Sequence, residues 1–135
     1  MSDERADKAD VAEVLIRYAT GIDTRDWALF ATCWTDDALT EYEGIGTWHS
    51  AADITEFMVA SHADMGHTMH RLTNLAISVD GDTATARSYV DAILMAVDGQ
   101  TGLSPRGIYE DRLVRTADGW RIAHRRFTMV HFTAI

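Results

Sequence analysis

The sequence predicts an α+β domain in which N-terminal helices pack on a sheet of antiparallel strands. Apolar residues recur at helical spacing along the first part of the chain. From Thr68 onwards, long strand-like segments are separated by the turn sequences 80–82, 98–102 and 118–119, each of which contains Asp and Gly. Because the helices precede the strands instead of alternating with them, the pattern favours a meander covered on one face by helices.

The helical part divides into two segments, which meet at the polar residues 23–26. The apolar residues of the first segment recur at helical spacing; they are Val11, Val14, Leu15, Tyr18, Ala19 and Ile22. So do those of the second, which are Trp27, Phe30, Ala31 and Trp34. We expect Asp36 and Asp37 to close the second helix. Five residues of an ideal helix turn the chain by about 140°. Tyr18 and Asp23 therefore share a pocket only if the helix ends between them, an ending that Gly21 favours.

A strand, a hairpin turn and a third helix follow. Residues 39–42 have strand character, and Gly44-Ile45-Gly46 is typical of a tight turn leading into Thr47 and Trp48. Ser50, with Asp53 three residues later, resembles a capping box and predicts a helix that ends near His62.

Alternation along the later strands gives an expectation for side-chain direction. On the strand that begins at Thr68, residues 75, 77 and 79 are apolar and share one face, whereas His70 alternates with the polar residues 74 and 78. A bulge would shift that phase, so the direction of His70 stays open. Arg125 lies opposite in strict alternation to Trp120 and Ile122, which makes an exposed arginine its default interpretation. Pro105 is expected in the longest loop between strands.

Length, charge and cysteine content limit the classes of function. The 135 residues favour a single domain, residues 1–135, with a flexible N-terminus at 1–8. A formal charge of −9 disfavours nucleic acids and anionic membranes as partners. The charged N-terminus lacks a signal-peptide core, and the lone Cys33 fits a reducing compartment, so we expect a cytoplasmic protein. Cys33 stands among apolar residues and is expected in the core.

Four sequence segments together resemble the SnoaL-like group of the NTF2-like superfamily over nearly the whole chain. They are Tyr18-x4-Asp23-x2-Asp26-Trp27, Glu43-Gly-Ile-Gly46-Thr, His70-x3-Asn74 and Gly119-Trp120-Arg-Ile-x2-Arg125. The resemblance implies a cone fold, with N-terminal helices on a strongly curved, mixed or antiparallel sheet. Within the group, the sequence is most similar to the lyases scytalone dehydratase, bile acid 7α-dehydratase and hexachlorocyclohexane dehydrochlorinase.

The resemblance also implies a site, although it carries over unevenly. Asp23 and His70 fall where these lyases place a catalytic Asp-His pair, and Tyr18 matches the tyrosine of the bile acid enzyme. The substrate-binding candidates are Tyr42, Tyr109, Arg125, Trp48 and Asp91. Ala92 replaces the second acid of the bile acid enzyme, with Asp91 one residue out of phase, and Met129 replaces its arginine. The substrate is therefore not inherited from any one member.

The function that this resemblance implies is a small lyase, most simply a dehydratase, that needs neither cofactor nor metal. An aspartate that orients an imidazole makes a general base suited to neutral pH. The expected substrate is a largely apolar, hydroxylated small molecule, because Met58, Met65, Met69 and Met95 are expected to line the core or a pocket. A curved sheet with an open apolar face also predicts a homo-oligomer, either a trimer or a dimer.

Other interpretations remain open at this stage. By local sequence alone, Asp23 is as well explained as a helix cap, and His70 as a hydrogen-bonded strand histidine. The same pair could serve a ketosteroid-isomerase-like or polyketide-cyclase-like enzyme. His62, His67 and His70 cluster with Asp64, which raises a metal-dependent enzyme, although their spacing is a weak ligand pattern. A binding module without catalysis is the remaining class.

Overall fold

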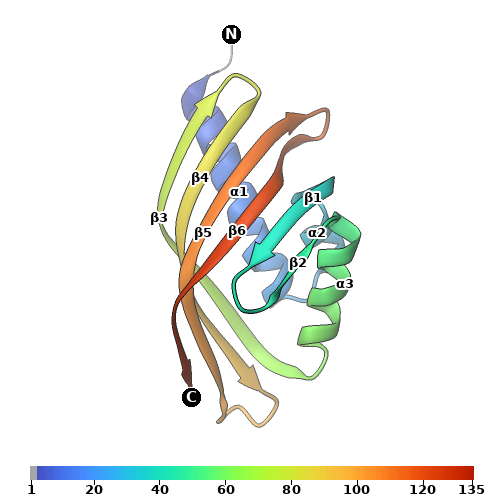
Figure 1. Cartoon of the computed structure of the whole chain (residues 1–135), viewed down its shortest axis with the longest axis vertical. Coiled ribbons are helices and arrows are strands. Elements are labelled where there is room, and N and C mark those ends of the chain that lie inside the picture. Colours follow the sequence, from blue (N-terminus) through green and yellow to red (C-terminus); the bar gives the residue numbers. More distant parts are fainter. Residues whose placement is uncertain (1–2) are drawn as a thin grey trace.

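The computed structural model describes residues 3–135, in which three helices pack on a six-stranded sheet (Figure 1). The elements in chain order are α1 (Glu4–Asp23), α2 (Trp27–Ala31), β1 (Trp34–Tyr42), β2 (Gly46–Trp48), α3 (Ala51–His62), β3 (Met65–Asp80), β4 (Thr83–Ala96), β5 (Gly102–Thr116) and β6 (Gly119–Ala134). Across the sheet the strands run β2-β1-β6-β5-β4-β3. The pair β1 and β6 is parallel and the other pairs are antiparallel. The predicted α+β class is confirmed, with a mixed sheet.

The four long strands bend along their length, and the helices cover one side of the sheet (Figure 1). Helix α1 runs along the sheet and contacts β3 and β6, while α3 lies beside β1. Among residues 3–135, none of the helices combines the length and apolar composition that a membrane span requires.

Helix α1 begins within the segment that was expected to be flexible. The Asp3 side chain accepts a hydrogen bond from the backbone of Arg5, so the helix starts at Glu4. Asp7 is buried and forms a two-pronged ion pair with Arg115 of β5, with both N–O distances at 3.0 Å. Residues 4–8 are therefore helical and anchored to the sheet, which corrects the expectation for this part of the N-terminus.

Helix α1 does not end between Tyr18 and Asp23, contrary to the expectation from Gly21. It continues to Asp23, and a Schellman arrangement follows in which Asp26 N–H donates to Gly21 C=O and Arg25 N–H to Ile22 C=O. Gly21 has a different role, because a Cβ there would lie 2.9 Å from the backbone nitrogen of Phe30. The absence of a side chain lets α2 approach α1 closely.

The second helix is shorter than predicted. Helix α2 ends at Ala31, and Asp36 and Asp37 belong to β1, which begins at Trp34. The carbonyl of Cys33 accepts a hydrogen bond from the backbone of Ile122, which draws the chain into the sheet at this point. The third helix follows its prediction, since Ser50 Oγ accepts the N–H of Asp53 at 3.0 Å.

A bulge in β3 decides the direction of His70. Thr73 pairs with Tyr89 and Ala76 with Arg87, so β3 carries one extra residue between these pairs. Asn74 takes up the irregularity with φ of 54°. Thr73 and Asn74 are consecutive exposed residues, and the alternation restarts beyond them. His70 therefore lies on the same inner face as the apolar residues 75, 77 and 79, instead of on the opposite face.

A second bulge reverses the expectation for Arg125. On β6, Ile122 pairs with Leu113 and His124 with Arg112, which leaves Ala123 as an inserted residue. Arg125 consequently points to the same side as Ile122 and is completely buried. The prediction from strict alternation, that Arg125 is exposed, is therefore wrong.

Two smaller expectations have opposite outcomes. Pro105 is not in a loop, because it lies within β5 opposite Phe132, at a position where the pairing of β4 with β5 is interrupted. Cys33 is fully buried in the core, and burial raises the pKa of its thiol to about 11. It is therefore protonated at neutral pH, as expected for a core residue.

The close approach at Gly21 gives a stability prediction. In an open helix position, Gly→Ala stabilises by about 1 kcal/mol. Because the methyl group of Gly21→Ala would meet the backbone of Phe30, we expect the opposite sign, a loss of about 1–3 kcal/mol in the free energy of unfolding. Urea unfolding measures this change. Thr20→Ala on the exposed side of α1 is the control and should change stability by less than about 0.5 kcal/mol; a more stable Gly21→Ala protein would contradict the packing argument.

Candidate functional site

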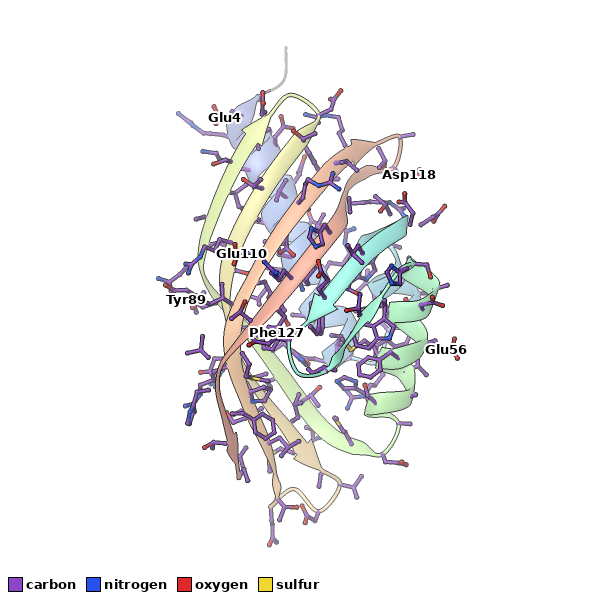
Figure 2. The ribbon with its side chains drawn as sticks, viewed as in Figure 1. Glu4, Glu56, Tyr89, Glu110, Asp118 and Phe127 are labelled. Atoms are coloured by element: carbon purple, nitrogen blue, oxygen red, sulfur yellow. The ribbon has the colours of Figure 1, made fainter. Side chains whose placement is uncertain are left out.

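The concave side of the sheet and the end of α3 enclose a cavity of about 570 Å³. That volume suits a small organic ligand. Its wall is mainly aliphatic and aromatic, and Phe127, which Figure 2 labels on β6, is part of it. The polar side chains in the wall are those of Tyr18, Tyr42, Tyr109, Ser61, His62, His70 and Glu43.

Asp23 and His70 meet directly at one end of this cavity. His70 Nδ1 lies 2.7 Å from Asp23 Oδ1, and the backbone N–H of His70 donates to Oδ2 at 2.8 Å. Thr68 Oγ1 donates to Oδ1 at 2.9 Å. His70 lines the cavity, whereas Asp23 stands behind it. The two residues that the sequence places far apart thus form one unit because the last residue of α1 contacts β3.

The charge on Asp23 sets the tautomer of His70. Partial burial opposes that charge, but the hydrogen bonds from His70 and Thr68 and the attraction of the imidazole outweigh it and lower the pKa of the carboxyl. A carboxylate accepts hydrogen bonds only, so Nδ1 of His70 carries the proton. Nε2 of the neutral ring is then an unprotonated base, and within residues 3–135 it has no hydrogen-bond partner.

Three tyrosines form a second polar group in the wall. The hydroxyls of Tyr18 and Tyr42 are 2.8 Å apart, and the ring of Tyr109 packs edge-on against Tyr18 at 5.8 Å between centroids. Burial raises the pKa of Tyr18, Tyr42 and Tyr109. These phenols therefore stay neutral at physiological pH and can donate hydrogen bonds. Tyr18 and Asp23 contribute to one site although the helix between them is unbroken, because Asp23 acts through His70.

Arg125 is not a cavity residue, which corrects the prediction that it binds substrate. Its guanidinium pairs with Asp111 through Nε at 2.7 Å and Nη2 at 2.9 Å, and both side chains are fully buried. Burial disfavours the charge of Arg125, but Asp111 keeps its pKa raised. The guanidinium carbon lies 3.8 Å from the ring centre of Tyr109 and 4.3 Å from that of Tyr18. Arg125 supports the tyrosines from behind.

Four other predicted residues, Asp91, Trp48, Met69 and Met95, lie outside the cavity wall. Asp91 is partly exposed, at 45% of its side chain, and pairs with Arg71 and Arg106, because its neighbour Ala92 takes the inward position on β4. Trp48 packs against Phe57 and Tyr42, with ring centroids 4.3 and 5.8 Å away, so it supports wall residues instead of lining the cavity. Met58 and Met65 do line it, whereas Met69 projects from β3 and is about half exposed.

Arg25 is a part of the site that sequence reasoning missed. It has φ of 58°, a left-handed conformation in which an L-residue other than Gly is strained. Its side chain donates to Ile22 C=O at 2.8 Å, to Thr68 Oγ1 at 2.8 Å and to Gly66 C=O at 2.7 Å. Thr68 is the residue that donates to Asp23. Arg25 therefore ties the end of α1 to β3 beside the Asp23–His70 pair.

His62, the last residue of α3, also belongs to the wall. Its Nδ1 lies 2.9 Å from Met58 C=O and must carry the proton, since a carbonyl only accepts. Burial lowers its pKa, and Nε2 is buried without a partner in the described part of the chain. The rings of His62 and His70 are 6.2 Å apart, but His67 and Asp64 are exposed. Within residues 3–135 there is no group of three His, Cys, Asp or Glu side chains placed to hold a metal ion.

Comparisons with known proteins agree with this architecture. A family model described as SnoaL-like domain matches residues 3–126. An uncharacterized protein of Mycobacterium tuberculosis is 31% identical over 124 residues, which is 90% of this chain and 84% of that protein. Hexachlorocyclohexane dehydrochlorinase 1 of Sphingobium indicum is 25% identical over 135 residues, covering 98% and 88% of the two chains. A crystal structure from Novosphingobium aromaticivorans, provisionally described as an aromatic ring hydroxylase, has 29% identity and a TM-score of 0.89, covering 99% of this chain and 96% of that one.

Arg25 and Asn74, which share a left-handed backbone, make a matched pair for mutation. Arg25→Gly relieves strain but removes the hydrogen bonds to Thr68 and Gly66, so we expect a net loss of about 1–3 kcal/mol in unfolding free energy. Asn74→Gly relieves similar strain, and no hydrogen bond of its side chain is present in residues 3–135, so stability should rise or change by less than about 0.5 kcal/mol. Chemical unfolding of both variants measures the two changes in the free energy of unfolding. Equal gains would show that the Arg25 bonds contribute nothing.

The buried ion pair predicts strongly non-additive substitutions. Arg125→Met leaves the Asp111 carboxylate buried without its partner and should cost about 3–5 kcal/mol. Adding Asp111→Leu removes that charge, so the double variant should be more stable than Arg125→Met alone. A double-mutant cycle from thermal or urea unfolding measures the coupling. Additive losses would contradict the interpretation of Arg125 and Asp111 as one neutral unit.

Proposed function

The chain belongs to the SnoaL-like domain family, as its sequence segments predicted, and we propose that it is a cofactor-independent lyase of the dehydratase type. The proposed substrate is a largely apolar, hydroxylated small molecule such as a hydroxy-ketone. The single observation that carries the proposal is the Asp23–His70 contact at the wall of an apolar cavity. A relative that is 25% identical over nearly the full chain is called a dehydrochlorinase, and such an elimination also begins at an acidic C–H bond.

His70 acts as the general base in the proposed reaction. Nε2 takes a proton from the carbon next to the substrate carbonyl, and Nδ1–H stays hydrogen-bonded to Asp23. The Asp23 carboxylate stabilises the imidazolium that forms, as an aspartate does beside a catalytic histidine in other enzymes. The electron pair of the broken C–H bond forms the new double bond while the C–O bond to the hydroxyl breaks. A positioned general base of this kind contributes about 10²–10⁴-fold to the rate.

The tyrosine pair supplies the acid side of the proposal. The departing hydroxide needs a proton, and the buried phenols of Tyr18 and Tyr42 are neutral donors in the same wall. One hydroxyl donates to the other, which leaves one proton of the pair for the leaving oxygen. The proton that His70 took from carbon then restores the phenol, so that both groups return to their starting state. The guanidinium of Arg125 lies under the rings of Tyr18 and Tyr109, outside the cavity. Its positive charge favours the negative charge that develops on the phenol oxygen as the proton leaves. Water and an alkene are the expected products.

A panel of hydroxy-ketones tests this proposal. His70→Ala and Asp23→Asn should each lower kcat/KM by about 10²–10⁴-fold, because one removes the base and the other its orienting charge. Tyr42→Phe should lower kcat by a smaller factor. Product analysis by mass spectrometry follows the loss of water, and an isomerised or cyclised product would indicate the isomerase-like or cyclase-like alternative instead.

Asp91→Asn is the matched control for Asp23→Asn. Asp91 is a partly exposed aspartate that pairs with surface arginines, so its variant should keep full activity. Circular dichroism and unfolding curves show whether each variant is folded. Activity retained in both His70→Ala and Asp23→Asn would refute the proposed mechanism.

A further inference from the structure

We propose that the cavity selects an uncharged substrate and rejects anionic ones, with Glu43 at its rim as the residue that determines this specificity. The inference rests on the proposed function of the cavity and narrows its substrate class. Glu43 is exposed and lines the cavity. Among the described residues of the wall it is the only Asp, Glu, Lys or Arg.

Glu43 is held in place by the sheet. Its backbone N–H donates to Phe127 C=O at 3.0 Å, and its Oε2 accepts the backbone N–H of Met129 at 3.0 Å. Phe127 and Met129 themselves line the cavity. A surface glutamate without such contacts would swing into solvent, but this carboxylate is fixed beside the apolar wall. The carboxylate is therefore held at the cavity rim.

No described cation in the wall balances that charge. The guanidinium of Arg125 lies behind the tyrosines and is neutralised by Asp111, and that of Arg25 is bonded to Thr68 and Gly66. A ligand carboxylate or phosphate would meet Glu43 at the cavity rim and a chain of net charge −9, with no cation of the wall to offset either. These charges disfavour a carboxylate or a phosphate-containing carrier on the substrate, and the mainly apolar wall favours a neutral compound.

Two probes of equal shape test the proposal by binding alone. Isothermal titration calorimetry compares 2-naphthamide, which is neutral, with 2-naphthoate, which is an anion. The wild-type protein should bind the amide at least about tenfold more tightly. Glu43→Gln keeps an acceptor for Met129 N–H but removes the charge. It should strengthen naphthoate binding by about threefold to tenfold and change the affinity for the amide by a smaller factor, so that the preference for the amide falls.

Glu56→Gln is the control, because Glu56 points away from the cavity on the outer side of α3 (Figure 2). It changes the net charge by the same amount and should leave the preference intact. Equal affinities of the wild type for the two probes would overturn the proposal, as would a preference that Glu43→Gln does not alter. Failure of both probes to bind would also overturn it. No turnover is measured, so a failure of the lyase mechanism appears in the His70 and Asp23 assays and not in this one.

Discussion

The hydrogen bonds that β3 makes to the Asp23 carboxylate are the constraint on which the site depends. Asp23 is the last residue of α1, and Thr68 and His70 of β3 lie forty-five and forty-seven positions further along the chain. Because the same contact fixes a helix end, a strand and an imidazole tautomer, the imidazole proposed as the base is already oriented in the free protein. Orientation that is already present in the free protein lowers the cost of reaching the reactive geometry.

The polar groups of the domain are divided between two layers. The inner layer, formed by His70 and the hydroxyls of Tyr18 and Tyr42, faces the cavity and carries no permanent charge. Apart from that of Glu43 at the rim, the charges described near the cavity lie in an outer layer, formed by Asp23, Arg125 and Asp111, which reaches the cavity only through the inner residues. The arrangement places electrostatic influence near the reaction while the wall itself stays suited to an apolar molecule.

Sequence periodicity was sufficient for the order of the helices and strands, because the apolar repeats and the Asp-Gly turns are local signals. It was not sufficient for the directions of the His70 and Arg125 side chains. Each direction depends on one inserted residue in its strand, and that residue is seen only in the pairing of the strands. The Asp23–His70 pair came from family resemblance, and local chemistry allowed a helix cap instead. The role of Arg25 was hidden because an arginine occupies a left-handed position where glycine is expected.

The extra residue near Asn74 limits how this chain can change over evolutionary time. Thr68 and His70 lie in one half of β3, and residues 75, 77 and 79 lie in the other. The two halves face the same side only because one residue is inserted between them. Deleting it would force one half outward, whichever register the strand kept. A substitution in this strand alters one side chain, whereas a change of length by one residue would turn a whole half of its inner face outward in a single step.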